Sequence, residues 1–319
     1  KYKGAAGNTI STEILTGAVS GTFDVNIYFG NSIVYSANVK TLADLQAVDN
    51  GFVEWTMEAL ADAEKSTMTG GSNGDAVTAA EHSAFLDAAE SYTFNAMGCL
   101  ATETAIQALY TQEVKDMREN KGMHYQVVLY GNAADHETVV NVKNCVDAVY
   151  WTLGVIAGCP VNQSNTNRVY DGEFEIPTNY TQAQLESAIK SGEFAFHKVG
   201  QETRVLCDIN SLVTTTLNKG EDFKANQTIR VIDQIAMDIA GIFNTKYIGK
   251  IPNNQSGRVS LWNDIVKHHQ QMETIGAIED FDPAGVVVSE GETKRSVVVQ
   301  DEVTIVNAME KLYMTVIVE

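Results

Sequence analysis

One short stretch has the spacing of a serine nucleophile. Residues 70–74, GGSNG, fit the pattern G-x-S-x-G, in which a tight turn between a buried strand and a helix exposes the serine, here Ser72. Residues 61–69 before it are polar, so the sequence does not indicate the buried strand that this arrangement needs. The glycine and serine content instead predicts a flexible linker over 66–74.

Two adjacent histidines, His268 and His269, could ligate a metal ion. They fall in a helical pattern, and neighbouring residues on a helix point to different faces. No Glu or Asp stands where the H-E-x-x-H zinc motif requires one. We therefore expect a solvated or partner-facing pair, with no metal site and no cofactor.

The remaining acid–base candidates fail on spacing. Asp233 and Asp238 are five residues apart, so on a helix they diverge by more than roughly 100° and cannot act together on one substrate. The sequence contains neither a P-loop nor a G-x-G-x-x-G motif. We therefore predict no catalytic residues, although a hydrolase with an α/β core stays open as an alternative.

Composition weighs against further classes of protein. The chain has 319 residues and a net charge of −19, a field that repels nucleic acids and anionic membranes. The longest apolar stretch, 146–156, is short and contains Asp147, so no membrane span is predicted. Four cysteines without C-x-x-C spacing indicate buried, reduced thiols. Because the first residue is Lys1, we expect a fragment of a longer protein.

The first part of the chain, 1–68, predicts a small antiparallel β module. Alternating apolar residues indicate strands at Thr9–Thr16, Phe23–Phe29 and Ser32–Val39, with a glycine turn joining the last two into a hairpin. A short helix should follow at residue 41, and Phe52–Trp55 is expected as the final strand.

The middle part, 69–168, predicts an α/β domain. Helices are expected from a capping box at residues 78–81 and, by periodicity, over Thr104–Asn120 and Cys145–Ala157. Tyr92–Leu100 and His124–Tyr130 are strand-like, and the second is a continuous apolar run typical of a buried parallel strand. This alternation of strand and helix indicates an α/β layer.

The last part, 169–319, predicts an α+β domain. A second capping box, at residues 181–184, predicts the start of a helix. Glu193–Val199 and Thr203–Ile209 flank a glycine turn and predict a β-hairpin. Two long amphipathic helices follow, and strands at Lys294–Val299 and Lys311–Val318 end the chain. The whole chain is therefore expected to be a multidomain protein of mixed α+β and α/β class. The apolar stripes of the two helices consist of Ile229, Ile232, Ile235, Ile239 and Ile242, and of Leu261, Trp262, Ile265, Val266 and Met272.

Charge is segregated in this last part. Residues 243–270 contain one acid, Asp264, whereas residues 273–292 contain no basic residue. The segregation is consistent with two solvated faces, or with a polymer contact in which a basic face meets a neighbour's acidic face. The basic residues, Lys246, Lys250, Arg258 and Lys267, are the candidate contacts with another subunit. The acidic ones are Glu273, Glu279, Asp280, Asp282, Glu290 and Glu292.

Several short motifs occur together between residue 160 and the end. They are N-Q-S-N-T at 162–166, Y-D-G at 170–172, E-F-x-F at 193–196, D-I-N-S-L at 208–212, K-G-x-D-F at 219–223, Asn226, I-R at 229–230, Asp233, I-A at 235–236, D-I at 238–239, Y-I-G-K at 247–250, G-R at 257–258, G-A-I at 276–278 with Phe281, and N-A-M-E-K-L-Y-M-T-V at 307–316. Their combination resembles contractile phage tail sheath proteins of Gram-positive phages, prophages and phage-tail-like bacteriocins. The resemblance is looser over 1–160, where G-N-T-I at 7–10 and T-G-G-S-N-G at 69–74 carry it.

This resemblance implies a structural role without enzymatic activity. Such subunits stack around a tail tube in an extended, metastable state, and contraction of the sheath drives the tube through a cell envelope. The partners implied are further copies of the chain, the tube protein, and baseplate and tail terminator proteins. The implied location is a virion tail, or a phage-tail-like particle, assembled in the bacterial host cytoplasm. The basic residues above would then contact another subunit or the tube.

The last strand acquires a role under this resemblance, because the terminal arms of the family pair as strands with neighbouring subunits. Apolar residues occupy both of its faces, and an exposed strand edge of that kind must be covered. Its candidate linking residues are Leu312, Tyr313, Met314, Thr315 and Val316. The alternative is an internal strand buried in the chain's own sheet. A surface-layer or adhesin-type structural protein is the rival function, since it shares the acidity and the few cysteines.

Overall fold

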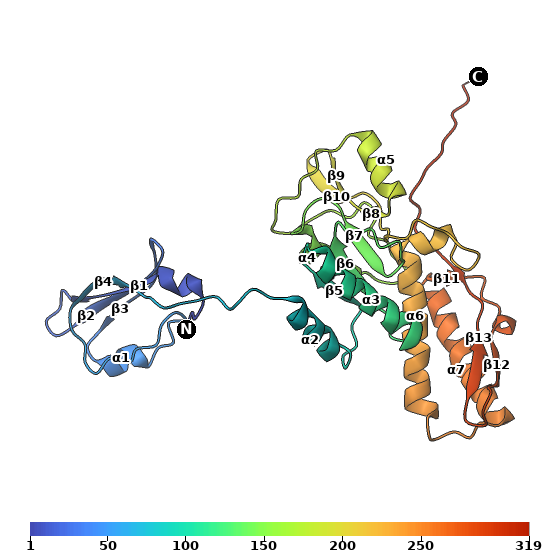
Figure 1. Ribbon diagram of the computed structural model, residues 1–319, viewed down its shortest axis with the longest axis horizontal. Helices are drawn as coiled ribbons and strands as arrows, with labels where there is room; N and C mark the ends of the chain where they lie inside the picture. The colour runs from blue at the N-terminus through green and yellow to red at the C-terminus, as the bar shows by residue number, and fades with distance from the viewer. Residues whose placement is uncertain (319) are drawn as a thin grey trace. The chain divides into compact units, whose positions relative to one another are not determined.

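The computed structural model describes residues 1–318, and the chain forms two compact units, Lys1–Thr78 and the part from Ala79 onward (Figure 1). The fold is of mixed α+β class with several separate sheets, as the sequence predicted. The division into three domains at 68/69 and 168/169 stays a prediction. Each unit is described by itself.

The first unit is built on a four-stranded antiparallel sheet with the order β3-β2-β1-β4. Its core consists of Ile10 and Ile14 from β1, Val25 and Ile27 from β2, and Leu45 from α1, all nearly inaccessible to solvent. The hairpin between β2 and β3 turns at Gly30, where φ is +60°, as the sequence predicted. The elements are η1 (Ala5–Thr9), β1 (Ile10–Thr16), β2 (Phe23–Phe29), β3 (Ser32–Val39), α1 (Leu42–Gln46) and β4 (Ala63–Thr67).

The fourth strand of this sheet is not the expected one. Residues 52–55 form no strand, because the Asn50 side chain accepts hydrogen bonds from Phe52 N and Val53 N (2.8 Å each) and holds them in a turn. The strand β4 is an exposed edge strand with the sequence AEKST. Its sequence shows no alternation of apolar and polar residues, so the pattern could not predict a strand here. Its charged residues suit an edge strand that must not pair with other chains.

The stretch expected to be a flexible linker is bonded to the beginning of the chain. Asn8 and Gly71 exchange two hydrogen bonds, Asn8 Nδ2 to Gly71 O (2.8 Å) and Gly71 N to Asn8 Oδ1 (2.7 Å). Ser72 N donates to Lys3 O (3.1 Å). A side chain at position 71 would lie 2.3 Å from Gly4 O, so this contact requires glycine. The motifs at 7–10 and 69–74 therefore contact each other.

The second unit contains a four-stranded parallel sheet with the order β5-β6-β7-β8. The predicted helix Thr104–Asn120 is found with those bounds as α3, and the predicted capping box at Thr181 and Gln184 begins α5. Part of the expected hairpin joins the main sheet instead, as β8. The strands are β5 (Ala96–Cys99), β6 (Gln126–Tyr130), β7 (Val139–Val142) and β8 (Glu193–Phe194), and the helices are α2 (Ala79–Ala89), α3, α4 (Ala148–Gly158) and α5 (Gln182–Lys190).

Both faces of this sheet are covered. Val127 and Leu129 of β6 pack with α2 and α3 on one face, whereas Val128 packs with α4 on the other. This two-sided burial explains the continuous apolar run of β6. The hairpin of β9 (Phe196–Val199) and β10 (Glu202–Val205) adds Phe196 and Val205 to the second core.

The remainder of the chain packs around two long helices. Ile229 and Ile235 of the first helix are buried, as are Leu261 and Ile265 of the second, which confirms the predicted stripes. A short antiparallel ribbon of β12 and β13 lies beside the second helix, and Trp262 Nε1 donates to Val286 O (2.9 Å) just before it. The elements are η2 (Glu221–Lys224), α6 (Asn226–Ile242), η3 (Phe243–Tyr247, a π turn), α7 (Gln255–Thr274), β11 (Ile278–Glu279), η4 (Pro283–Gly285), β12 (Val287–Glu290), β13 (Val297–Gln300) and β14 (Thr304–Ile305).

A buried carboxylate, Asp208, joins the parallel sheet to these helices. Its Oδ2 accepts from Asn165 N (2.9 Å) and Arg230 Nη2 (3.2 Å), and its Oδ1 accepts from Asn226 Nδ2 (2.9 Å). Asn226 in turn accepts from Gln126 Nε2 of β6 (2.8 Å). The Asp208 side chain is fully inaccessible to solvent. We call these five residues the polar junction.

Replacing Asp208 by Ala is expected to cost about 3–5 kcal/mol of stability, because Arg230 would keep its charge in a buried place without a carboxylate. Urea unfolding followed by the fluorescence of Trp151 and Trp262, in a Trp55→Phe background, measures the effect on the second unit. Glu221→Ala is the control, since that exposed carboxylate pairs only with Lys224. An equal loss in both variants would contradict this role of the polar junction.

Candidate assembly interface

The candidate linking strand forms no strand within its own chain. Residues 311–318 are all exposed, including Leu312 (86%), Ile317 (83%) and Val318 (89%). Within residues 1–318, none of these residues forms a hydrogen bond or an ion pair with the rest of the chain. Figure 1 shows this segment leading away from the second unit. The alternative of a strand buried in the chain's own sheet is therefore wrong, and we call residues 311–318 the C-terminal arm.

The base of the arm, by contrast, is held firmly on α6. The Gln227 side chain makes two hydrogen bonds to the backbone, from Nε2 to Val306 O (3.1 Å) and from Ala308 N to Oε1 (3.0 Å). Thr228 Oγ1 donates to Asn307 Oδ1 (3.2 Å). Gln227 and Thr228 are buried and directly follow Asn226 of the polar junction. The junction thus sets the point from which the arm departs.

Glu310 is the last anchor before the arm. Its Oε1 accepts from Thr166 Oγ1 (2.5 Å), and its Oε2 accepts from Cys207 Sγ (3.5 Å). Burial, together with the neighbouring Glu310 carboxylate, raises the pKa of Cys207 to about 12. The thiol therefore stays protonated at neutral pH and can donate to Glu310. These contacts join the arm base to the N-Q-S-N-T motif and to Cys207, the residue just before the D-I-N-S-L motif.

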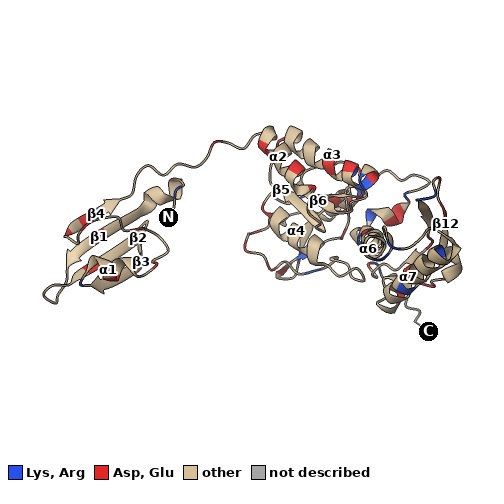
Figure 2. Ribbon diagram, turned by 90° about the horizontal axis from the view of Figure 1, so that it is seen from below, with Lys and Arg blue, Asp and Glu red and all other residues tan. Residues whose placement is uncertain are grey.

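The predicted basic residues lie along α7 and around the turn between α6 and α7. Lys246 Nζ pairs with Asp264 Oδ1 (3.1 Å), and Tyr247 Oη donates to Asp264 Oδ2 (2.8 Å). Burial and this hydrogen bond raise the pKa of Tyr247 to about 12. Burial alone would raise the pKa of Asp264, but its bonds to Tyr247 and Lys246 hold it below the usual value. Figure 2 shows both signs of charge on α7.

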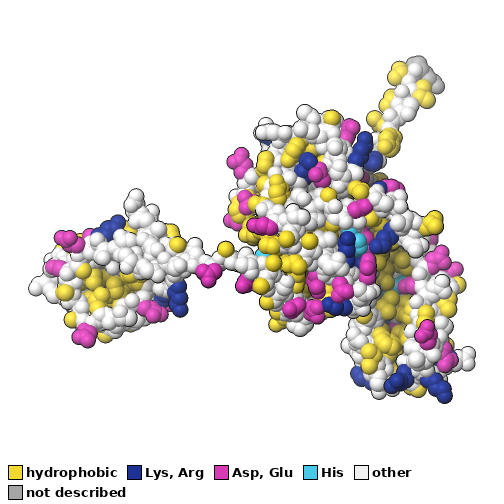
Figure 3. All heavy atoms as spheres, viewed as in Figure 1, with side chains coloured by type: hydrophobic (Ala, Val, Ile, Leu, Met, Phe, Trp, Pro, Cys, Tyr) yellow, Lys and Arg dark blue, Asp and Glu magenta, His cyan; other side chains and the backbone are white. Residues whose placement is uncertain are grey.

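The end of this helix pair is more basic than the sequence indicated. Arg258 donates to Asn253 Oδ1 (3.0 Å), and Lys250 Nζ donates to Thr245 O (2.6 Å). Lys294 and Arg295, from the turn between β12 and β13, line a pocket of about 520 Å³ together with Arg258. Figure 3 shows Lys and Arg side chains gathered at the lower end of the α6 and α7 region, beside exposed apolar surface. Lys267 is exposed farther along α7. We call this surface the basic end.

The predicted acidic segment is not a separate face. Glu290 lies 4.0 Å from Arg258, at the basic end itself. Glu273 accepts from Phe281 N (3.1 Å), and Asp282 accepts from Ala284 N (2.9 Å), so both carboxylates hold local turns. The charge segregation of the sequence is therefore only partly a segregation in space, because the β12–β13 ribbon folds back along α7.

The two histidines are not solvated, contrary to expectation. His268 is 8% exposed and His269 is inaccessible, and their Nδ1 atoms lie 3.1 Å apart. His268 Nε2 contacts Asp238 Oδ2 (2.9 Å), and His269 Nε2 contacts Asp301 Oδ2 (2.6 Å). Both imidazoles can be buried from adjacent positions because α7 packs between α6 and the segment that follows β13.

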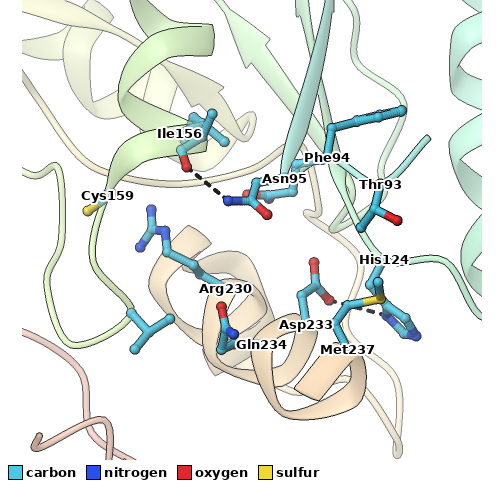
Figure 4. Close-up of a pocket in the computed structure, with 13 residues that line it drawn as sticks. Thr93, Phe94, Asn95, His124, Ile156, Cys159, Arg230, Asp233, Gln234 and Met237 are labelled. Atoms are coloured by element: carbon cyan, nitrogen blue, oxygen red, sulfur yellow. Dashed lines mark hydrogen bonds and ion pairs between the residues drawn. The ribbon is translucent and has the colours of Figure 1, made fainter. Parts of the chain in front are cut away.

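A second pocket, of about 260 Å³, lies between α6 and the approach to β5 (Figure 4). Its charged groups already pair: Asp233 accepts from Arg118 (2.5 Å) and lies 3.3 Å from His124. Asp238 faces His268, so the two aspartates diverge as their spacing predicted. Within residues 1–318, no group of three or more His, Cys, Asp or Glu side chains is placed to hold a metal ion. No helix there is both long and apolar enough to cross a membrane.

Two protein-family models match most of the second unit. Residues 75–211 match the phage tail sheath protein central domain, and residues 218–319 match the phage tail sheath C-terminal domain. The PBSX phage-like element protein XkdK of Bacillus subtilis is 28% identical over 359 aligned positions, covering 99% of this chain and 76% of that protein. The tail sheath protein of Clostridium phage phiCD119 is 31% identical, over 54% of this chain and 51% of that protein.

Solved structures give the same result. A sheath tail protein from Desulfitobacterium hafniense is 30% identical, with a TM-score of 0.80 over 98% of this chain and 76% of that one. The helical sheath of the anti-feeding prophage in its contracted state shares the fold at 12% identity, with a TM-score of 0.52 over 67% of each chain. Profile, sequence and structure therefore agree that this chain belongs to the phage tail sheath family.

Proposed function

We propose that the chain is a structural, non-enzymatic subunit of a contractile tail sheath. Copies of it polymerise around a tail tube, and contraction of the polymer drives the tube through a cell envelope. Baseplate and tail terminator proteins are its partners at the two ends of the sheath. The particle is a virion tail or a phage-tail-like relative, assembled in the cytoplasm of the bacterial host.

One observation carries this proposal: the C-terminal arm exposes an apolar surface on both faces while its base is tightly bonded. A single soluble chain gains nothing from such a segment, and an unpaired extended stretch of this kind invites pairing with another chain. In a polymer, the arm of one copy becomes a strand in a neighbour's sheet. Main-chain pairing tolerates rotation of the bodies that it joins, as contraction requires.

The β12–β13 ribbon is the acceptor that we propose for the arm. Within residues 1–318 it has two strands and neither outer edge pairs with another strand, and an isolated two-stranded ribbon is marginally stable in water. Val287 and Val298 on it are about half exposed, at 49% and 51%. An added strand covers an edge and extends the apolar surface that the ribbon presents.

The basic end is the proposed contact with the tube or with another subunit. It gathers positive charge in a chain whose net charge is −19, so it attracts acidic partners that the rest of the surface repels. Its predicted residues are Lys246 and Lys250 from the turn between α6 and α7, and Arg258 and Lys267 from α7; Lys294 and Arg295 add to it. The apolar pocket between them can accept an uncharged side chain from the same partner.

Deleting the chain from Lys311 onward should leave stability unchanged and abolish assembly. The deleted residues make no bonded contact within the described chain, so the urea midpoint of the isolated protein should match that of the intact one. Electron microscopy of particles that carry the truncated sheath protein should show tubes without a sheath. The counterpart is the substitution Gln227→Ala, which frees the base of the arm and should lower both stability and sheath yield. Normal sheaths from the truncated protein would contradict the proposal.

Charge reversal at the basic end should weaken assembly. Lys250→Glu together with Arg258→Glu should reduce sheath formation by at least about tenfold, equivalent to ~1.4 kcal/mol, and assembly of the variant should depend strongly on salt, which screens the new repulsion. Lys198→Glu on β9 is a matched control, because that lysine is exposed and lies in a different part of the unit. Equal assembly by both mutants, measured by sedimentation, would refute the contact.

A further inference from the structure

Four side chains form an unbroken line through the helical part of the second unit, with the two histidines buried and the two aspartates partly exposed at its ends. Asp238 of α6, His268 and His269 of α7, and Asp301 after β13 touch in that order, at 2.9, 3.1 and 2.6 Å. The line joins three segments, so it is a polar fastening between α6, α7 and the chain that leads to the arm, in addition to the bonds of Gln227 and Thr228 to residues 306–308. We call it the proton bridge.

The number of protons in this line follows from its contacts. Each Nε2 atom faces a carboxylate, which only accepts, so each Nε2 must carry a hydrogen. The two Nδ1 atoms face each other, and one of them must donate to the other. Three of the four ring nitrogens therefore carry hydrogen. Two neutral imidazoles supply only two hydrogens, so the pair needs one more proton than two neutral histidines hold.

We propose that His268 and His269 share a single positive charge between the two aspartates, and that this shared proton makes the fastening of the C-terminal segment sensitive to pH. When the shared proton is lost, one of the three contacts has no hydrogen. When a fourth proton is added, two N–H groups face each other across 3.1 Å, and both rings are charged. The fastening is therefore strongest between these limits.

The surroundings leave the two aspartates as the only charged partners of the rings within residues 1–318. From α6, the uncharged Gln234 side chain donates to the other oxygen of Asp238 (2.8 Å). From the loop before β12, the Phe281 ring packs edge-on against His269, with ring centroids 5.1 Å apart. Lys267 and Glu302 are neighbours in sequence but point to solvent. The β12–β13 ribbon contributes valines to this region.

The substitution Asp301→Asn isolates the effect. An asparagine amide can donate to His269 Nε2, so that this nitrogen no longer needs a hydrogen. One hydrogen on His268 Nε2 and one between the two Nδ1 atoms then satisfy the other two contacts, and both imidazoles are neutral. Glu302→Gln is the matched control, since it removes one negative charge at the next position without touching the line. The variant thus changes the proton count without removing a contact.

Nitrogen-15 NMR of histidine-labelled protein at neutral pH counts the protonated ring nitrogens of this pair. We expect three in the wild type, three in Glu302→Gln and two in Asp301→Asn. Two in the wild type would overturn the proposal, and because that measurement is made on the unaltered protein, it holds whatever the variants do.

The urea midpoint between about pH 5 and pH 8, the range in which histidines change charge, supplies the second measurement. The wild type and Glu302→Gln should lose stability toward both ends of that range. Asp301→Asn should keep its stability toward the alkaline end, because it has no extra proton to lose. An alkaline loss of the same size in Asp301→Asn as in the wild type would contradict the shared charge.

Discussion

The structure of the second unit depends on one constraint: a carboxylate without access to water, Asp208, must find all of its hydrogen bonds inside the protein. Its partners come from segments far apart in sequence. Asn165 belongs to the N-Q-S-N-T motif, Asn226 and Arg230 to α6, and Asn226 extends the line of bonds to β6. Because an unpaired buried charge costs several kcal/mol, these segments can dock in only one arrangement.

That arrangement fixes the position of the arm base, on which the proposed function depends. The N-Q-S-N-T segment reaches Asp208 with one residue, the end of α7 with Asn162, and Glu310 with Thr166. The arm base therefore rests on the same few residues that join the sheet to the helices. In the proposed function, this rigid departure point and the exposed arm together make a tether, which pairs with another chain while the body behind it stays folded. Motifs recognised through family resemblance thus make contacts that hold the sheet, the helices and the arm base together.

The sequence predicted elements well where local physics dominates. The helix Thr104–Asn120, the capping box at Thr181 and the turn at Gly30 follow from periodicity, capping and backbone freedom, and all three are confirmed. It failed where distant segments decide the outcome. The edge strand β4 has no apolar pattern, and the two histidines are buried only because Asp301 comes back to meet them. The arm reads as a strand because its residues suit a sheet, but within residues 1–318 it pairs with no strand of its own chain.

Of the candidate site, the basic residues of α7 and of the turn before it could be named from the sequence, whereas Lys294 and Arg295 could not. They join the basic end through the fold-back of the β12–β13 ribbon, which also brings Glu290 beside Arg258 and blurs the separation of charge. A basic pair just after an acidic run, at a hairpin turn, was the available signal. This signal can be interpreted only once the pairing of β12 with β13 is known, because that pairing places Lys294 and Arg295 beside the other basic residues.

The central claim is that the C-terminal arm is unpaired in the free chain and becomes a strand of another copy in the sheath. Amide hydrogen exchange of residues 311–318, measured in the free protein and again in assembled particles, tests this most directly. We predict rapid exchange in the free chain and strong protection after assembly, with new protection in the β12–β13 ribbon. Exchange that stays rapid in the assembled sheath would contradict the claim.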